Sequence, residues 1–286
     1  MTLSAEAPAK INRELRVGRI RPDGFHEVLS RMVSIDVADR LSVDTADDLR
    51  FRCDDPAVPV GEDNLVVRAA RALAAAAGLP ARARIDLEKR TPMGGGLGGG
   101  SADAAVALIL LAELWGCDPS LRARLPEVAG TLGSDVPFFL FGGQADVRGR
   151  GEVVRAVEDA APTELVLLVP PFPVSTAEVY RAYAGRGRLP ERLDVEAPGP
   201  RTFFGPNDLT PAVLQVEPRM GVYLASAARV AAEHAVSGSG STIVLRAGPA
   251  ALDELRARHP EARVLSCSTL TRDSYRLRTN PNGGSS

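Results

Sequence analysis

A run of glycines in the middle of the chain constrains the fold more than any other segment. Six of the seven residues from Gly94 to Gly100 are glycine, and ordering such a run costs backbone entropy. Alternation over 83–88 predicts a strand before it, and Ser101–Trp115 is typical of a strong helix, with Ser101 near its cap and Asp103 in its first turn. Glycine N–H groups and a helix N-terminus together favour an anion. We predict an anion site here, with a flexible linker as the alternative.

Two common phosphate motifs fit this segment poorly. Gly94, Gly96 and Gly99 satisfy the dinucleotide pattern G-x-G-x-x-G, but almost any glycine run does so. The preceding ARIDLEKR is half polar, whereas the dinucleotide fold places a buried strand there. A Walker loop needs a lysine before Ser101, where Gly100 stands. A dinucleotide site therefore stays a weak alternative, and a Walker loop is excluded.

Strands and helices are interleaved along the rest of the chain without a strict order. Alternating or short apolar patterns predict strands at 31–37, 39–44, 48–52, 164–169, 242–246 and 262–265. Helical spacing predicts helices at 64–77, 176–184, 212–216, 220–234 and 250–259. The Gly-, Pro- and Arg-rich residues 185–206 indicate an exposed loop. Because the strict alternation of a doubly wound sheet is missing, we predict an α+β fold with antiparallel pairing.

Charge and cysteine content exclude several classes of protein. The 34 basic and 36 acidic residues leave a net charge of -2, so no overall positive field attracts nucleic acid or an anionic membrane. The three cysteines, Cys53, Cys117 and Cys267, argue against a disulfide framework or a zinc cluster and favour a reducing cytoplasm. We find no signal-peptide pattern, and no apolar stretch reaches the ~20 residues of a membrane span.

Lysine is almost absent from the chain. Lys10 and Lys89 are the only lysines among 34 basic residues, so the other 32 are arginine. A GC-rich genome is the simplest explanation of this skew. A lysine retained in such a chain still marks a position worth examining, because lysine and arginine differ in size and donor geometry. We take Lys10 as a candidate functional cation and expect Lys89 to be a solvated strand end.

Five segments of the chain resemble one family of small-molecule kinases. In chain order they are APAKIN (7–12), RPDGFHEV (21–28), PMGGGLGGGSADAA (92–105), GSDVPFFLFGG (133–143) and SGSGST (237–242). The glycine segment resembles the phosphate-binding motif of the GHMP kinases. The five segments together resemble the 4-diphosphocytidyl-2-C-methyl-D-erythritol kinases within that superfamily, and their shared order makes the resemblance specific.

The resemblance implies a two-domain α+β fold with the active site in the cleft between the domains. A ribosomal protein S5 domain 2-like domain that binds ATP would cover residues 1–155, and an α/β-sandwich domain would cover 156–275. Residues 276–286 are expected to form a disordered tail. The implied reaction transfers the γ-phosphoryl group of ATP to the 2-hydroxyl of 4-diphosphocytidyl-2-C-methyl-D-erythritol, in the non-mevalonate route to isoprenoids.

The same resemblance assigns the reacting groups. It makes Asp135 the catalytic base, although an aspartate before Val-Pro is by itself more often a cap or turn residue. It implies that Lys10 lies beside Asp135, where an ammonium keeps the carboxylate ionised and helps to orient the acceptor hydroxyl. Taken alone, Lys10 is as well explained as a surface lysine. Alternation along an extended segment puts Asn12 on the face of Lys10, so we expect it in the same pocket.

The segment RPDGFHEV is implied to recognise the cytosine of the substrate through Asp23, Phe25 and His26. Phe25 stands where the family commonly has tyrosine. Stacking on the base, worth roughly 1–3 kcal/mol, is kept by this change, and a phenolic hydrogen bond is lost. We expect Tyr180 on the other face of the base and Thr176 nearby. The alternatives are an exposed histidine in a turn and ordinary helix packing of Tyr180 and Thr176.

ATP and Mg²⁺ are the implied cosubstrate and metal. The residues expected to bind ATP are Pro92, Met93, Gly94, Gly95, Gly96, Leu97, Gly98, Gly99, Gly100, Ser101, Ala102 and Asn64. Asn64 is equally well suited to cap the helix that follows it. The sequence offers no carboxylate cluster for Mg²⁺, so we assign no metal ligand. SGSGST resembles the third motif of the superfamily, with a plain turn before a strand as its alternative.

Three other functions stay open at this point. They are a different GHMP kinase acting on mevalonate, homoserine or a sugar, a nucleotide-binding sensor without catalysis, and a dinucleotide oxidoreductase. RPDGFHEV argues against the first, and the presence of both Lys10 and Asp135 argues against the second. We expect a cytoplasmic monomer or homodimer whose partner is a small molecule carrying a cytidine diphosphate group.

Overall fold

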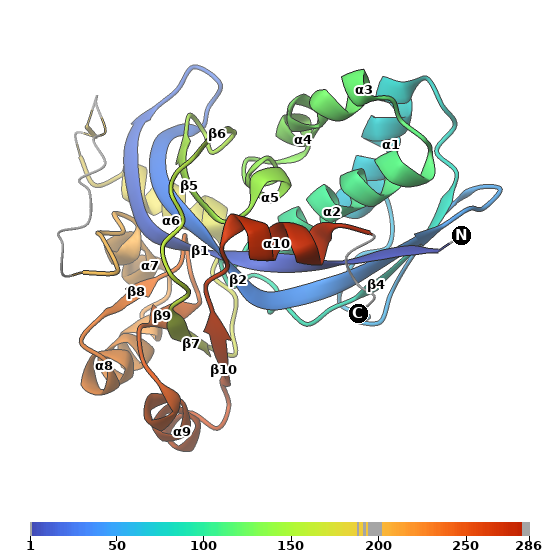
Figure 1. The fold of residues 1–286 in the computed structure, drawn as a ribbon. Coiled ribbons are helices and arrows are strands. Elements are labelled where there is room, and N and C mark those ends of the chain that lie inside the picture. The colour runs from blue at the N-terminus through green and yellow to red at the C-terminus, as the bar shows by residue number, and fades with distance from the viewer. Residues whose placement is uncertain (1, 188, 191–192, 194–201, 282–286) are drawn as a thin grey trace.

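Two sheets organise the fold (Figure 1). The computed structural model describes residues 2–187, 189–190, 193 and 202–281. The strands of the larger sheet are β1 (Leu3–Ile20), β2 (His26–Asp44), β3 (Leu49–Cys53), β4 (Ala83–Glu88), β5 (Gln144–Arg148) and β6 (Val153–Ala156). Their order is β3-β4-β2-β5-β6, with β1 also paired to β2. Among the described strands only β3 and β4 pair in parallel, so the predicted α+β class is confirmed.

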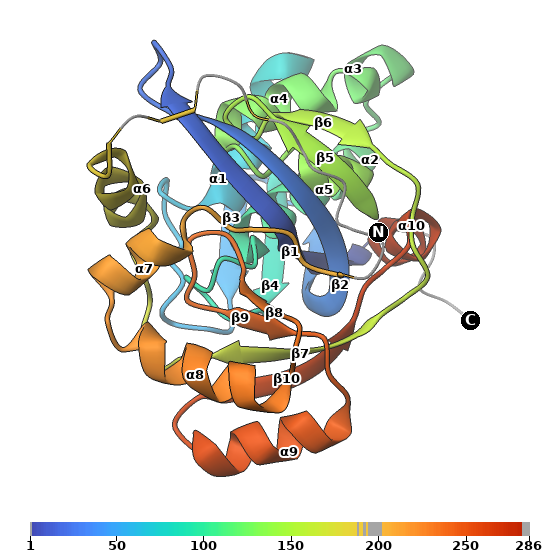
Figure 2. The same ribbon diagram turned by 90° about the vertical axis from the view of Figure 1, so that its left-hand side faces the viewer.

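The strands β1 and β2 form a long antiparallel hairpin that passes through both halves of the molecule (Figure 2). One end of the hairpin packs in the core under the larger sheet, and the other end packs in the second core, where Leu15, Val17 and Val28 are buried. The two strands predicted at 31–37 and 39–44 are one continuous strand. Of β1, only an extended segment around Lys10 and Asn12 was predicted, and the pairing of β1 with β2 shifts register beside these two residues.

Helices cover one face of the larger sheet. They are α1 (Leu65–Ala77), α2 (Gly99–Leu114), α3 (Pro119–Ala123), α4 (Leu125–Leu132) and α5 (Phe138–Phe141). The residues of α2 from Ala102 to Leu108 are all buried. A helix that is apolar on every side is stable only where other elements enclose it, and α2 lies between the hairpin and α1. The glycine segment therefore leads into the best-packed helix of this half.

The second half has an antiparallel sheet with helices on its outer side (Figure 2). Its strands are β7 (Glu164–Val169), β8 (His234–Val236), β9 (Ile243–Leu245) and β10 (Arg263–Ser268), in the order β10-β7-β9-β8. Its helices are α6 (Thr176–Ala184), α7 (Thr210–Val216), α8 (Met220–Val230) and α9 (Pro249–Arg258). The helix predicted over 220–234 ends at Val230, because His234 begins β8. Residues 188, 191–192 and 194–201 of the predicted loop lie outside the described residues.

The end of the chain returns to the first half as helix α10 (Arg272–Thr279). The ring of Tyr275 is buried against Gly142, and its hydroxyl donates to the carbonyl oxygen of Phe139 at 2.5 Å. Arg278 pairs with Glu6 of β1 at 2.6 Å. Residues 276–279 of the expected disordered tail therefore belong to an anchored helix, and residues 282–286 lie outside the described residues. The domain limits at 155 and 275 stay a prediction.

A third apolar cluster joins the two halves. It contains side chains of the hairpin, of the smaller sheet and of the glycine segment, namely Ala9, Ile11, Val33, Ile35, Leu97, Leu165, Leu167, Val169, Phe203, Val244 and Cys267. Because Leu97 is part of it, the glycine segment is fixed where the two halves meet. No helix in the described part of the chain combines the length and the apolar character needed to cross a membrane.

Candidate active site

A cavity of about 930 Å³ opens beside the glycine segment. Its walls come from β1, β2, α6, the turn before α5, the β5–β6 turn and the loop 237–242. Its volume lies in the range of small-molecule sites. The predicted residues that line it are Lys10, Asn12, Phe25, His26, Pro92, Met93, Gly94, Gly95, Gly96, Leu97, Gly98, Gly99, Gly100, Ser101, Asp135, Thr176 and Tyr180. Asp23, Asn64 and Ala102 do not line it.

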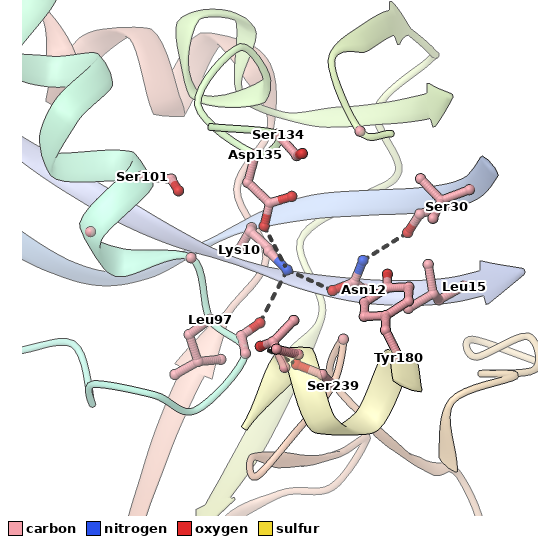
Figure 3. Close-up of a pocket in the computed structure, with 18 of the residues that line it drawn as sticks. Lys10, Asn12, Leu15, Ser30, Leu97, Ser101, Ser134, Asp135, Tyr180 and Ser239 are labelled. Atoms are coloured by element: carbon pink, nitrogen blue, oxygen red, sulfur yellow. Dashed lines mark hydrogen bonds and ion pairs between the residues drawn. The ribbon is translucent and has the colours of Figure 1, made fainter. Parts of the chain in front are cut away.

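Lys10 and Asp135 face each other at the centre of this cavity (Figure 3). Lys10 Nζ lies 3.4 Å from Asp135 Oδ2, donates to Asn12 Oδ1 at 2.7 Å and donates to the carbonyl oxygen of Gly96 at 3.1 Å. The lysine side chain is 4% exposed and the aspartate side chain 31% exposed. The ammonium is thus held from several sides, while the carboxylate stays accessible to a ligand.

The orientation of Asn12 follows from its other neighbours. The Ser30 hydroxyl donates to the carbonyl oxygen of Glu14 at 2.6 Å, so it accepts the hydrogen bond from Asn12 Nδ2 at 2.7 Å. This leaves Asn12 Oδ1 for Lys10, as Figure 3 shows. Ser30 was not predicted, because its position opposite Leu15 depends on the shifted register of the hairpin.

The glycine segment is packed on both sides. Gly96 and Gly98 have φ values of 75° and 70°, a conformation that favours glycine. A Cβ on Gly96 would collide with the carbonyl oxygen of Ser237, and a Cβ on Gly98 would lie 2.8 Å from Phe139 Cζ. The backbone N–H of Lys10 also donates to Leu97 O at 2.9 Å. These contacts exclude a flexible linker, and they tie SGSGST to the site.

Helix α2 begins at Gly99, with Gly98 as its N-cap and no side-chain cap. Its first helical hydrogen bond runs from Ala102 N to Gly98 O at 2.9 Å. By helix geometry, the preceding N–H groups of residues 99–101 point away from the helix and are available to an anion. Ser101 is therefore in the first turn, near the cap as predicted, whereas Asp103, predicted in the first turn, is buried in the second. Ala102 is buried in the core.

The turn that carries Phe25 is exposed. Phe25 is 48% exposed, and the guanidinium of Arg150 lies 5.1 Å from its ring centroid. Asp23 pairs with Arg21 at 3.2 Å and accepts the N–H of Phe25 at 3.1 Å. Asp23 therefore shapes the turn and does not itself reach the cavity.

His26 and Tyr180 form the wall next to this turn. Their ring centroids are 5.2 Å apart. Burial lowers the pKa of His26, whose Nε2 is buried without a hydrogen-bond partner in the described part of the chain. Burial, helped by the negative charge of Asp135, raises the pKa of Tyr180, so its hydroxyl stays protonated. Thr176 Oγ1 lies 2.8 Å from Ser239 Oγ, so α6 is joined to the SGSGST loop.

Asn64 caps helix α1. Its Oδ1 accepts from Val66 N at 2.8 Å, and its Nδ2 donates to Pro59 O at 2.7 Å. The adjacent Leu65 lines the cavity instead. A role of Asn64 in ATP binding stays a prediction, and the capping alternative describes its contacts.

Lys89 is not a solvated strand end. Its side chain is 6% exposed, and its ammonium lies 2.5 Å from Asp39 Oδ2 and 2.9 Å from Asp103 Oδ2. The attraction of the two carboxylates outweighs the opposing effect of burial and raises the pKa of Lys89. Local sequence gives no sign of this burial, because one of the partners, Asp39, lies fifty residues away in the chain.

Sequence reasoning also missed several residues of the cavity wall. They are Leu15, Ile20, Ser30, Leu65, Lys89, Ser134, Arg150, Gly151, Ala177, Arg181, Ala184, Gly238 and Ser239, among others. Three cations in the described lining, Lys10, Arg150 and Arg181, face one acidic residue, Asp135, whereas the fourth, Lys89, is already paired with two buried carboxylates. The cavity is therefore locally positive although the chain carries a net charge of -2, which suits an anionic ligand.

Comparisons with known proteins agree on one family. The family model "GHMP kinases N terminal domain" matches residues 64–143. A 4-diphosphocytidyl-2-C-methyl-D-erythritol kinase from Pelotomaculum thermopropionicum is 49% identical over 69% of this chain and 69% of its own length. One from Salinibacter ruber is 38% identical over 90% of this chain and 96% of its own length.

A solved structure gives the same result. The crystal structure of a 4-(cytidine 5'-diphospho)-2C-methyl-D-erythritol kinase superposes with a TM-score of 0.77 at 33% identity, covering 93% of this chain and 99% of that one. The identity extends over both halves of the fold, beyond the matched N-terminal segment. This small-molecule kinase therefore belongs to the 4-diphosphocytidyl-2-C-methyl-D-erythritol kinase family of the GHMP kinases.

Proposed function

We propose that Asp135 and Lys10 carry the transfer of the γ-phosphoryl group of ATP to the 2-hydroxyl of 4-diphosphocytidyl-2-C-methyl-D-erythritol. The observation that supports this most is the distance of 3.4 Å between Lys10 Nζ and Asp135 Oδ2, in a cavity that also reaches the start of α2. In the proposed reaction the hydroxyl oxygen bonds to the γ-phosphorus, the bond to the ADP oxygen breaks, and the hydroxyl proton goes to Asp135.

Each of the two side chains has a separate task. Asp135 is partly exposed to the cavity, so it can accept a hydrogen bond from the acceptor hydroxyl and take its proton. Lys10 holds that carboxylate in place and adds positive charge close to the transferred group. Asn12 and the Gly96 carbonyl fix the ammonium, so little reorganisation is needed when charge develops.

The start of α2 fits the phosphates of ATP. Residues 99–101 offer N–H groups that no helical carbonyl accepts, and the glycines before them leave room for the polyphosphate. Mg²⁺ neutralises part of the phosphate charge when it is bound. No group of three or more His, Cys, Asp or Glu in the described part of the chain is arranged to hold a metal ion. We therefore propose that phosphate oxygens and water supply most of its ligands.

The exposed ring of Phe25, with His26 and Tyr180, forms the cytosine end of the proposed site. Phe25 offers a face for stacking. Thr176 and Ser239 supply hydroxyls to the cavity wall, and Arg150 and Arg181 supply positive charge suited to the diphosphate. We also propose that the enzyme is cytoplasmic, which the free cysteines Cys53, Cys117 and Cys267 support. We propose further that it works as a monomer or homodimer.

The test is a turnover assay with ATP and four acceptors: the cytidyl substrate, mevalonate, homoserine and galactose. We expect turnover with the cytidyl substrate alone. Asp135→Asn should lower kcat by about 10²-fold or more and leave ATP binding unchanged, because the carboxylate acts on the acceptor. Asp48→Asn, an exposed aspartate paired with Arg50, is the matched control.

Two outcomes would count against the proposal. Preference for mevalonate, homoserine or galactose would assign the chain to a different acceptor within the superfamily. Full turnover by Asp135→Asn would remove the proposed base.

A further inference from the structure

A buried cluster of charged residues lies beneath the start of α2, outside the proposed reaction. Lys89 bridges Asp39 of β2 and Asp103 of α2, at 2.5 and 2.9 Å. The side chains are 6%, 0% and 3% exposed. Burying three ionisable groups carries a large desolvation cost, so such a cluster calls for an explanation beyond stability.

The cluster is attached to both ends of the glycine segment 92–98. Asp39 Oδ1 accepts the backbone N–H groups of Arg90 and Thr91, at 2.6 and 2.7 Å, directly before Pro92. On the other side of the segment, Asp103 lies one turn into α2.

The first residue of α2 also rests on the cluster. A Cβ on Gly99 would lie 2.9 Å from Thr91 Cγ2 and 3.3 Å from Lys89 Nζ. Lys89 therefore links residues 90–91, which precede the glycine segment, to helix α2, which follows it.

Both carboxyl groups of the cluster depend on Lys89 for charge compensation. Two carboxylates against one ammonium would leave a net negative charge under the polyphosphate. Burial raises the pKa of Asp103 well above its ordinary value, and Asp39 adds to this while Lys89 opposes it. One oxygen of Asp103 is buried without a hydrogen-bond partner in the described part of the chain. Burial thus makes the negative charge of Asp103 costly, and the ion pair with Lys89 offsets part of that cost.

We propose that Lys89 is a positioning residue for ATP: by joining Asp39 to Asp103 it fixes both ends of the glycine segment and keeps the N–H groups of residues 99–101 aligned on the polyphosphate. The inference rests on the proposed function, because it needs ATP at the start of α2. The cytosine end belongs to other elements, the β1–β2 turn and α6. Loss of the bridge should therefore weaken ATP binding much more than binding of the acceptor.

The experiment compares Lys89→Met and Asp103→Ala with the wild-type protein. Calorimetric titration gives the Kd of ATP without acceptor, well below the unfolding temperature, and steady-state kinetics give both KM values and kcat. We expect the ATP Kd to rise about tenfold or more and kcat to fall, because small misplacements of catalytic groups cost about 10²-fold. The acceptor KM should change less than about twofold.

Arg90→Met is the matched control. Arg90 is the neighbouring cation, is 60% exposed and pairs with the exposed Glu88. The Arg90→Met variant should bind ATP with the same Kd as the wild-type protein. Asp103→Ala keeps the Lys89–Asp39 pair, so it tests the bridge even if Lys89→Met does not fold.

The outcomes separate this inference from the proposed function. A wild-type protein that does not bind ATP overturns both. A wild-type protein that binds ATP, with folded Lys89→Met or Asp103→Ala variants that bind it equally well, overturns the positioning role alone. If the affinities for ATP and for the acceptor fell equally, the cluster would contribute only to general stability. That result would also overturn the positioning role.

Discussion

The two ends of the cavity are built in different ways. At the glycine end, backbone atoms make the surface, and Gly96, Gly98 and Leu97 are packed against other segments. At the end proposed to bind cytosine, side chains make the surface, and Phe25 stands on an exposed turn. A backbone site is rigid and allows little change in sequence, whereas a side-chain site on a turn accepts substitutions. This difference agrees with the proposal that the glycine end binds the triphosphate of ATP and that the other end binds the cytosine.

Gly96→Ala should have the largest effect. Its Cβ would collide with the Ser237 carbonyl, and its φ of 75° strains any residue with a side chain. We expect a loss of about 2 kcal/mol or more in the free energy of unfolding and a fall in kcat/KM for ATP of about 10²-fold. Gly130→Ala, in α4 with nothing near its Cβ, should be neutral or slightly stabilising. Chemical denaturation and kinetics measure both. Wild-type behaviour of Gly96→Ala would refute the rigidity of the glycine end.

Phe25→Ala should have an intermediate effect confined to the acceptor. Losing the stacking face should raise the acceptor KM by about tenfold, as expected for roughly 1–3 kcal/mol of base stacking, and leave the ATP KM unchanged. Phe25→Tyr should stay close to wild type, because it keeps the ring. Val60→Ala, an exposed apolar residue that does not line the cavity, controls for loss of apolar surface. A change in the ATP KM would show that the two ends are not independent.

The smallest effect should be the pH dependence that His26 contributes. Burial lowers its pKa below 6.5 in the folded protein. The unfolded chain therefore binds a proton that the folded protein does not, and stability falls as the pH falls through 6.5 towards the folded pKa. We expect urea denaturation between pH 7.5 and 5.5 to show a smaller loss of stability in His26→Gln than in the wild-type protein. Equal losses would mean that His26 is as hydrated as in the unfolded chain.

Local patterns predicted the parts of the site that depend on neighbours in sequence. The glycine run and the helix after it were visible as a motif, and alternation put Lys10 and Asn12 on one face. The pairing of Lys10 with Asp135 came from resemblance to a family, since nothing local joins residues 125 positions apart.

The rest depends on tertiary packing. Ser30 reaches Asn12 through a hairpin whose register shifts twice beside the site. Lys89 is buried because Asp39 and Asp103 compensate its charge, and a polar residue at the end of a strand carries no sign of that. His234 begins a strand because it pairs with Leu245 of β9, against a local pattern that favours helix.

The anchoring of α10 sets an order for biosynthesis. The Tyr275 hydroxyl bonds the Phe139 carbonyl, and the Phe139 ring lies against Gly98 of the glycine segment. Every other element of the larger sheet and its helices has been translated by residue 156, yet this support arrives only with α10, more than a hundred residues later. A ribosome-bound chain thus exposes an unfinished site, and an enzyme truncated before Tyr275 should keep its strands while losing the support behind its glycine segment.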